Sequence, residues 1–344
     1  MRALILDEHG PRLVTDRPEP PMSSDPDGPA VDALVRVLRS GLGWLDLAAV
    51  SGRVPHSGVL GHEIVGRVES APSQKLVGGL VAVAPEVACG SCDLCRAGIP
   101  SHCRHLRLLG FGGTDGGMAD RIAVPARNLC PVPEGIELDT AVLAQPVADA
   151  VHVARMVPIE RKTFVTVIGD GLGALVIAQI LARRNASVRL LGARPERFGL
   201  CERWQVRHRD IREAGMRADQ DVVVACFDPG YDTTHGMGLP PEDASSIAIG
   251  MLRPRGTLVA AGPAVPVPGA GLDLSRTAGE VVAKELRIVG ARRGRIADGL
   301  AAIANNEVEL APLITSRARL DDGVAILRTA ADPAQLRTVV EVAA

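Results

Sequence analysis

The chain has 344 residues, with 38 Lys and Arg against 40 Asp and Glu and a formal net charge of −2 at pH 7. This balance excludes a strongly basic protein, so no general electrostatic attraction to nucleic acid or to an anionic membrane is expected. Apolar residues make up 47% of the sequence but aromatic residues only 2%. We therefore expect two folded domains with aliphatic cores.

The first ten residues include charges and lack the apolar core of a signal peptide. The longest apolar stretch, Phe164 to Leu181, contains Asp170 and three glycines, which a helix in hydrocarbon tolerates poorly. We predict a soluble, cytoplasmic protein.

Short strand-like segments dominate the N-terminal third, and turn residues separate them, a pattern typical of a β-barrel or sandwich. From about residue 139 helical spacing begins, and strands then alternate with helices, which predicts parallel βαβ units and an α/β protein. The final strand is expected to rejoin the first domain. The predicted strands are 2–6, 33–38, 62–70, 79–87, 119–126, 163–168, 187–192, 221–227, 257–262 and 336–344; the predicted helices are 139–157, 172–183, a segment from about 195, 241–253 and 298–305.

Four of the seven cysteines lie in the segment "CGSCDLCRAGIPSHC": Cys89, Cys92, Cys95 and Cys103. Short C-x₂-C steps can supply four thiolates from one loop to a tetrahedral zinc ion. A disulfide cluster is the alternative, and a cytoplasmic location disfavours it. Because four protein ligands leave no open position, we interpret this site as structural rather than catalytic.

A glycine turn follows a predicted strand and opens a predicted helix in "VTVIGDGLGALVIAQ". Its G-x-G-x-x-A pattern predicts a dinucleotide site: Gly169 for the tight turn, Gly171 for close approach to the pyrophosphate, and Ala174 for close packing of helix and sheet. The helix start, with Leu172 and Gly173, would face the phosphates. A turn of this kind without a ligand is the alternative.

The end of the next strand distinguishes the two nicotinamide dinucleotides. An NAD site places Asp or Glu there to accept from the ribose 2′-OH, whereas this chain has Gly192, followed by Arg194 and Arg197. A guanidinium can bind a 2′-phosphate through two hydrogen bonds, which favours NADPH. Alternatively, the two arginines belong to a solvated helix start.

In this order, the GHE sequence at 61–63, the four-cysteine loop and the glycine turn resemble the medium-chain dehydrogenase/reductase family, which includes the zinc alcohol dehydrogenases. The resemblance implies an α/β protein with a GroES-like β-barrel catalytic domain and an inserted Rossmann domain with a doubly wound parallel sheet. The expected boundaries are 1–150 for the catalytic domain, with a zinc lobe at 85–110, 151–289 for the Rossmann domain, and 290–344 for the return. It also implies an active site between the domains and a homodimer or homotetramer.

Zinc-dependent members of the family usually carry a segment similar to G-I-C-G-T-D-x-H before the GHE sequence. The matching positions here are 41–48, where Gly43 replaces the ligand cysteine, Leu45 the hydroxyl residue and Ala48 the relay histidine. A later carboxylate ligand is matched by Gln145. A catalytic zinc needs about three protein ligands, so the sequence predicts a degenerate site without catalytic zinc.

Several polar residues of that site remain. The resemblance implies that Asp46 contacts His62 and that Arg337 lies near Glu63. Without metal, Asp46 would orient His62 and favour its protonated form, making His62 a general acid. Alternatively, all four residues only keep the domain folded. A long loop, 228–246, contains Tyr231 and His235; it either overhangs the nicotinamide or is a surface excursion.

We therefore predict an NADPH-dependent oxidoreductase without catalytic zinc that reduces an activated C=C or C=O bond of a small, secondary-metabolite-like substrate. The first alternative is a zinc-dependent alcohol or polyol dehydrogenase with atypical catalytic ligands. The second is a catalytically silent dinucleotide-binding sensor.

Overall fold

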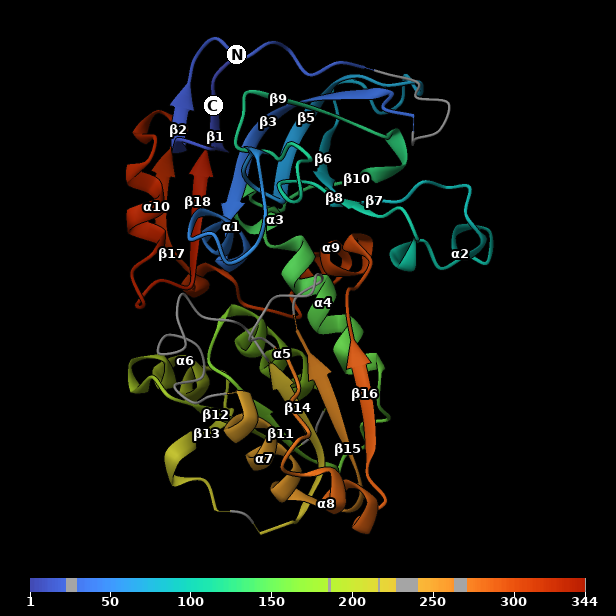
Figure 1. Cartoon of the computed structure of the whole chain (residues 1–344), viewed down its shortest axis with the longest axis vertical. Coiled ribbons are helices and arrows are strands. Elements are labelled where there is room, and N and C mark those ends of the chain that lie inside the picture. The colour runs from blue at the N-terminus through green and yellow to red at the C-terminus, as the bar shows by residue number, and fades with distance from the viewer. Residues whose placement is uncertain (23–29, 185–186, 216, 227–240, 263–270, 344) are drawn as a thin grey trace. The chain divides into compact units, whose positions relative to one another are not determined.

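The computed structural model describes the whole chain except residues 23–29, 185–186, 216, 227–240, 263–270 and 344 (Figure 1). Tyr231, His235 and most of the predicted loop at 228–246 lie outside the described residues. The chain divides into two compact units. One consists of Met1–Gln145 with Leu313–Ala344, and the other of Pro146–Pro312.

The first unit is mainly antiparallel β-structure. Its largest sheet has the order β10-β6-β5-β3-β18-β17, with β9 also paired to β3; a second sheet has the order β2-β1-β4, and β7 pairs with β8. These strands are β1 (Ala3–Asp7), β2 (Gly10–Val14), β3 (Ala33–Leu42), β4 (Gly58–Val59), β5 (Glu63–Ser70), β6 (Leu80–Val83), β7 (Glu86–Val87), β8 (Arg107–Leu108), β9 (Arg121–Val124), β10 (Leu129–Pro131), β17 (Ile314–Arg319) and β18 (Arg337–Glu341). Short helices connect them: α1 (Trp44–Val50), α2 (Asp93–Arg96), η1 (Pro100–His102), η2 (Ala126–Asn128), α3 (Leu138–Ala141), η6 (Leu320–Asp322) and α10 (Ala325–Ala330).

The last strand of the chain closes this unit. β18 pairs antiparallel with β3, opposing Thr338 to Leu42, and parallel with β17. The two chain ends lie side by side, because Arg2 Nη2 donates to the backbone oxygen of Val342 over 2.9 Å (Figure 1). The first unit is therefore completed by residues from both ends of the sequence.

The second unit is built on a six-stranded sheet of order β13-β12-β11-β14-β15-β16, in which every pairing is parallel (Figure 1). Its strands are β11 (Phe164–Ile168), β12 (Ser187–Gly192), β13 (Arg207–Asp210), β14 (Gln220–Cys226), β15 (Leu252–Ala261) and β16 (Arg287–Ala291). The helices are α4 (Ala144–Arg155), which begins at the unit boundary, α5 (Leu172–Arg183), η3 (Pro195–Arg197), α6 (Phe198–Arg203), η4 (Ile211–Glu213), α7 (Pro241–Met251), α8 (Ala278–Ala283), α9 (Ile296–Ala304) and η5 (Ala311–Leu313). This architecture confirms the predicted α/β fold with a parallel sheet.

Aliphatic side chains form the core of the second unit, as its composition requires. Ile168 of β11, Leu191 of β12 and Val223 of β14 are fully buried against Ala244 and Ala248 of α7. The strand order reverses at β11: β12 and β13 lie on one side of it, and β14, β15 and β16 lie on the other. This is the arrangement of a doubly wound sheet. The carboxyl end of β11 therefore lies at the topological switch point, where ligands of such sheets bind.

Two local features differ from the sequence-based expectations. The second unit extends to Pro312 rather than 289, because β16 pairs with β15 of its sheet and α9 follows it within the same unit. The helix predicted at 139–157 is divided into α3 and α4. Pro146 lies in the first turn of α4, where its missing N–H breaks no helical hydrogen bond. No described helix is both long enough and apolar enough to cross a membrane.

Candidate functional site

The GHE sequence lies at the start of β5, in the middle of the first unit. Gly61 has a φ of +95°, and a Cβ there would lie 2.6 Å from Ser40 Oγ, so the turn into the strand requires glycine. Glu63 opposes Gly41 of β3 in the strand register. His62 and Glu63 are both buried, at 7% and 3% exposure. The turn at Gly61 and the pairing of β5 with β3 therefore set the positions of His62 and Glu63 without a ligand.

Asp46 links helix α1 to this turn. Its side chain is fully buried, and its two oxygens accept the N–H groups of Gly43 over 3.0 Å and of Gly61 over 2.8 Å. His62 Nδ1 lies 3.5 Å from Asp46 Oδ2, which is an ion-pair distance longer than a regular hydrogen bond. Burial alone would raise the pKa of the Asp46 carboxyl, but the His62 ring and the two N–H groups outweigh it and lower the pKa. The structure thus brings Asp46 and His62 together as predicted.

Glu63 pairs with Arg337, which β18 brings from the far end of the sequence. Glu63 Oε1 and Arg337 Nη2 are 3.0 Å apart, and the two side chains are 3% and 7% exposed. Glu63 Oε2 and Arg337 Nε and Nη1 are buried without a hydrogen-bond partner among the described residues. A buried pair of opposite charges avoids the large cost of either charge alone. Each of these two residues therefore depends on the other.

Two glycines make room for this pair. A Cβ at Gly41 would lie 2.2 Å from Glu63 Oε2, and a Cβ at Gly43 would lie 2.1 Å from Arg337 Nη1. The guanidinium thus occupies the space that a side chain at position 43 would need. Leu45 and Ala48, at the other two replaced positions, are buried apolar side chains, 3% and 4% exposed.

The donor set around His62 does not fit a catalytic zinc ion. A zinc site of this kind needs about three protein ligands, but position 43 has no side chain and Glu63 is engaged by a cation. Among the residues that the structure describes, only the four cysteines form a group of three or more potential ligands close enough to share a metal. We therefore derive no chemical step through a metal at His62.

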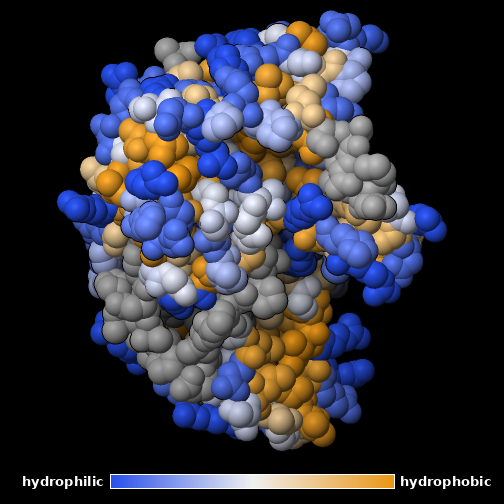
Figure 2. Space-filling view, turned by 45° about the horizontal axis from the view of Figure 1, so that its top comes forward, coloured by the Kyte–Doolittle hydropathy of each residue, from blue (hydrophilic) through white to orange (hydrophobic). Residues whose placement is uncertain are grey.

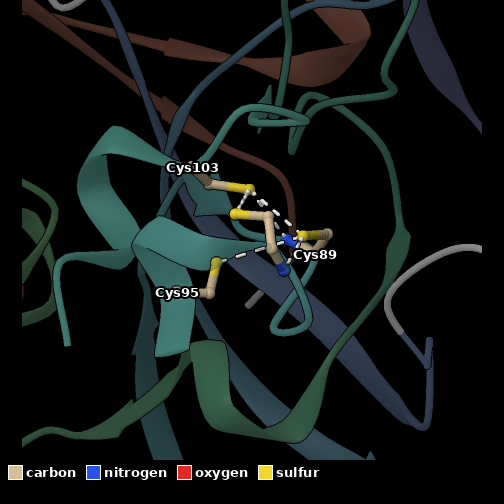
Figure 3. A group of neighbouring side chains, drawn as sticks. Cys89, Cys95 and Cys103 are labelled. Atoms are coloured by element: carbon tan, nitrogen blue, oxygen red, sulfur yellow. Dashed lines mark hydrogen bonds between the residues drawn. The ribbon is translucent and has the colours of Figure 1, made fainter. Parts of the chain in front are cut away.

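The four cysteines do fit a zinc ion. Their sulfur atoms all lie within 4.8 Å of one another, with separations of 3.4 Å (Cys89 and Cys103), 3.9 Å (Cys92 and Cys103) and 4.0 Å (Cys89 and Cys95). A tetrahedron with Zn–S bonds of about 2.3 Å needs sulfur atoms roughly 3.8 Å apart. Figure 3 shows the labelled side chains of Cys89, Cys95 and Cys103 converging on one point.

Backbone groups of the same loop prepare these thiols for metal binding. The N–H and hydroxyl of Ser91, with the N–H of Cys92, donate to Cys89 Sγ and lower the pKa of the Cys89 thiol to about 5. Loss of solvent contact, with the neighbouring Cys92 thiol, raises the pKa of Cys95 to about 12. The Cys89 thiol therefore loses its proton more readily than the Cys95 thiol, and a cation beside Cys95 would lower the pKa of that thiol.

The predicted dinucleotide turn lies at the carboxyl end of β11. Gly169 has a φ of +121°, which L-residues rarely adopt, and its N–H donates to the backbone oxygen of Leu191 over 2.8 Å. Gly171 is the N-cap of α5, and Leu172, Gly173 and Ala174 form its first turn. The N–H groups of such a turn have no partners within the helix and can bind a phosphate. This geometry fits a pyrophosphate.

The glycine turn after β11 contains a residue whose contacts with the segment after β12 the sequence did not reveal. Asp170, inside the glycine turn, accepts the backbone N–H groups of Ala193 over 2.7 Å and of Arg194 over 2.9 Å. Its other oxygen pairs with Arg194 Nη1 at 2.5 Å and Arg197 Nη1 at 3.3 Å. The arginine side chains are only 15% and 8% exposed. The two arginines are therefore not part of a solvated helix start. Asp170 holds both guanidinium groups in place.

Residues 29–134 match the sequence model of the alcohol dehydrogenase GroES-like domain. An uncharacterized zinc-type alcohol dehydrogenase-like protein of Haemophilus influenzae is 26% identical over 336 residues, which cover 94% of this chain and 92% of that protein. L-threonine 3-dehydrogenase of Streptomyces coelicolor is 30% identical over 279 residues, covering 71% of this chain and 78% of the relative. The chain belongs to the medium-chain dehydrogenase/reductase family.

The solved structures agree with this assignment. A zinc-binding dehydrogenase of Sinorhizobium meliloti 1021, bound to NADP, superimposes with a TM-score of 0.82 at 23% identity, covering 99% of each chain. The predicted GroES-like and Rossmann architecture is confirmed. As a member of the medium-chain dehydrogenase/reductase family, the protein is an NAD(P)-dependent oxidoreductase, which also confirms the predicted enzyme class.

Proposed function

We propose that the protein is an NADPH-dependent reductase without catalytic zinc, acting on an activated C=C or C=O bond of a small molecule. One observation carries the proposal. The guanidinium of Arg337 occupies the space of the absent ligand side chain at position 43 and pairs with Glu63. A cation at this position repels a second cation. Because Glu63 is paired with Arg337, His62 is the one side chain of the GHE sequence left to bind a metal.

His62 is the proton donor in this proposal, and Asp46 is its positioning residue. NADPH, when bound, supplies a hydride to the electrophilic carbon of the substrate. Reduction of a carbonyl then needs one proton on oxygen, and reduction of an activated double bond needs one proton on carbon. The imidazolium form of His62 can give that proton, and the buried Asp46 carboxylate, 3.5 Å from Nδ1, orients the ring. Glu63 and Arg337 hold the adjoining strands together.

The choice of NADPH rests on the end of β12. Gly192 carries no carboxylate to repel a 2′-phosphate, and Arg194 and Arg197 place two positive charges beside it. The NADP bound to the Sinorhizobium meliloti neighbour is consistent with this choice. We further propose that Cys89, Cys92, Cys95 and Cys103 hold one structural zinc ion, because their sulfur separations fit a tetrahedral site.

The competing function is a zinc-dependent alcohol or polyol dehydrogenase, which the zinc-type relative in Haemophilus influenzae favours. The metal content of the purified enzyme distinguishes the two. We expect one zinc per chain and NADPH oxidation that survives brief treatment with a chelator. Two zinc ions per chain, with activity lost to the chelator and restored by Zn²⁺, would support the dehydrogenase instead. A protein that binds NADPH but turns over no carbonyl or enone substrate would be a sensor.

We also propose that the chain associates with copies of itself, as a dimer or tetramer. Strand β16 lies at the edge of the parallel sheet, and Val282 of the preceding helix is 77% exposed. Figure 2 shows a continuous hydrophobic area at the lower end of the molecule. An unpaired strand edge beside apolar surface is a common interface. Light scattering coupled to size-exclusion chromatography tests this, and a mass of 36.0 kDa would contradict it.

A further inference from the structure

Asp170 is a buried carboxylate at the centre of the predicted dinucleotide site. Its side chain is 1% exposed, although it follows the first glycine of the turn, where any small residue would satisfy the G-x-G pattern. Four donors converge on it: the N–H groups of Ala193 and Arg194 on Oδ2, and Nη1 of Arg194 and of Arg197 on Oδ1. A carboxylate is buried at this cost only where its charge is matched.

The position of this carboxylate coincides with the strand end that selects the dinucleotide. A Cβ added at Gly192 would lie 2.8 Å from the Cβ of Asp170 and 2.9 Å from its Oδ2. In a site that prefers NAD, the residue at this strand end carries the carboxylate that accepts from the ribose 2′-OH and repels a 2′-phosphate. Asp170 therefore brings a carboxylate to the same place from the neighbouring turn, and it excludes a side chain at 192.

Both arginines pair with the carboxylate of Asp170. Arg194 Nη1 is 2.5 Å from Oδ1 and Arg197 Nη1 is 3.3 Å away, so two positive charges surround one negative charge. Arg194 is the more exposed of the two, at 15% against 8%. Removing its side chain would leave the backbone N–H groups of residues 193 and 194 in place. The Asp170 carboxylate would then stay in place, but it would lose its ion pair with the Arg194 guanidinium.

We propose that Asp170 is a masked specificity-determining residue: a carboxylate of the type that selects NAD, held at the end of β12 and covered by Arg194. This inference rests on the proposed binding of a nicotinamide dinucleotide at the glycine turn. It goes beyond the proposed preference for NADPH, because it predicts that the same site prefers NADH once the Arg194 side chain is removed. If Asp170 only anchored the loop, its charge would not affect the choice of cofactor.

The test is a double-mutant comparison with dissociation constants for NADPH and NADH, measured by fluorescence titration. We expect Arg194→Ala to favour NADH by about threefold, rather than merely to lose preference for NADPH. Adding Asp170→Asn to Arg194→Ala should then raise the NADH-to-NADPH ratio of dissociation constants at least about fivefold, because the repelling charge is gone. Arg253→Ala, at a half-exposed arginine paired with Asp221, is the matched control and should change neither constant.

An equal change in both affinities on adding Asp170→Asn would overturn the inference, since that is the behaviour of a loop anchor. If the Asn variant does not fold, Asp170→Ser in the Arg194→Ala background replaces it. A serine hydroxyl can accept a backbone N–H but carries no charge. The wild-type preference tests the proposed function separately. A wild type that binds NADPH and NADH equally would contradict the NADPH proposal. The comparison of Arg194→Ala with and without Asp170→Asn would still test the role of Asp170.

Discussion

The four-cysteine loop brings together all four thiols of its proposed zinc site, whereas the region around His62 has a glycine at position 43 and a buried ion pair between Glu63 and Arg337. The loop contains only a two-stranded pairing of β7 with β8 and single turns of helix, and three of its four cysteines are partly exposed. It has too little core to fold by burial alone. Glu63, in contrast, lies in a sheet that pairs β5 with β3 and β3 with β18. We therefore expect a metal to contribute more to the stability of the four-cysteine loop than to that of the region around His62.

The strongest test of this contrast removes one thiolate. We expect Cys92→Ser to lose the zinc ion, because three ligands do not close a tetrahedral site, and to lower the unfolding temperature markedly. Elemental analysis and calorimetry measure the two effects. Cys130→Ser is the matched control, since Cys130 lies in β10 outside the cluster, and it should keep its zinc. Zinc-free wild-type protein, purified without chelator, would contradict the assignment.

The second test addresses the other region. His62→Gln keeps a side chain of similar size but cannot form an imidazolium, so we expect turnover to fall roughly 10²-fold with NADPH affinity nearly unchanged. Glu63→Gln should have a smaller effect on turnover, because its partner is Arg337 rather than the substrate. Steady-state kinetics and cofactor titration separate the two quantities. A fully active His62→Gln enzyme would move the proton donor elsewhere.

A third test adds a single methyl group. Gly43→Ala places a Cβ 2.1 Å from the present position of Arg337 Nη1, so the guanidinium must shift from the position in which it pairs with Glu63. We expect a loss of about 1–3 kcal/mol in the free energy of unfolding, typical of overpacking near a buried pair. Denaturant titration measures it. Gly199→Ala, in α6 where a Cβ meets nothing within 4 Å, is the control and should be neutral or stabilising. Equal stability of both variants would show that Arg337 does not need this space.

The smallest effect is expected at the surface of the zinc lobe. Arg104 donates two hydrogen bonds of 2.7 Å to Asp93, but the side chains are 62% and 59% exposed, so solvent screens the pair. Asp93→Asn should therefore leave the zinc content and the unfolding temperature unchanged within error. A loss of zinc in this variant would mean that surface charge, and not only the thiolates, holds the lobe together.

The parts that sequence predicts best are those encoded locally. The spacing of four cysteines and the alternation of apolar strands with helices both reach the correct structure, because each depends on neighbouring residues. The strands β13, "RHRD", and β17, "ITSRAR", were not predicted, since polar side chains on partly exposed strands hide the apolar pattern.

The sequence predicts which residues belong to the candidate sites, but not which of them contact one another. The sequence predicts the loss of a ligand at Gly43, yet the occupation of that space by Arg337 is a contact between residues far apart in the sequence. Likewise, the sequence predicts Arg194 as a phosphate ligand but gives no sign that this arginine pairs with the buried carboxylate of Asp170. Such contacts depend on the distances between side chains in the folded chain, which no local pattern records.

Strand β18 has a consequence for how the protein is made. Glu63 is translated early, but Arg337, its buried counter-ion, is carried by the last strand. Until that strand pairs with β3, the first unit holds an acidic group that it cannot bury without a cation. The whole second unit is synthesised in the interval, so it can finish folding first although it starts later. The order of domain maturation on the ribosome would then be the reverse of the order of synthesis.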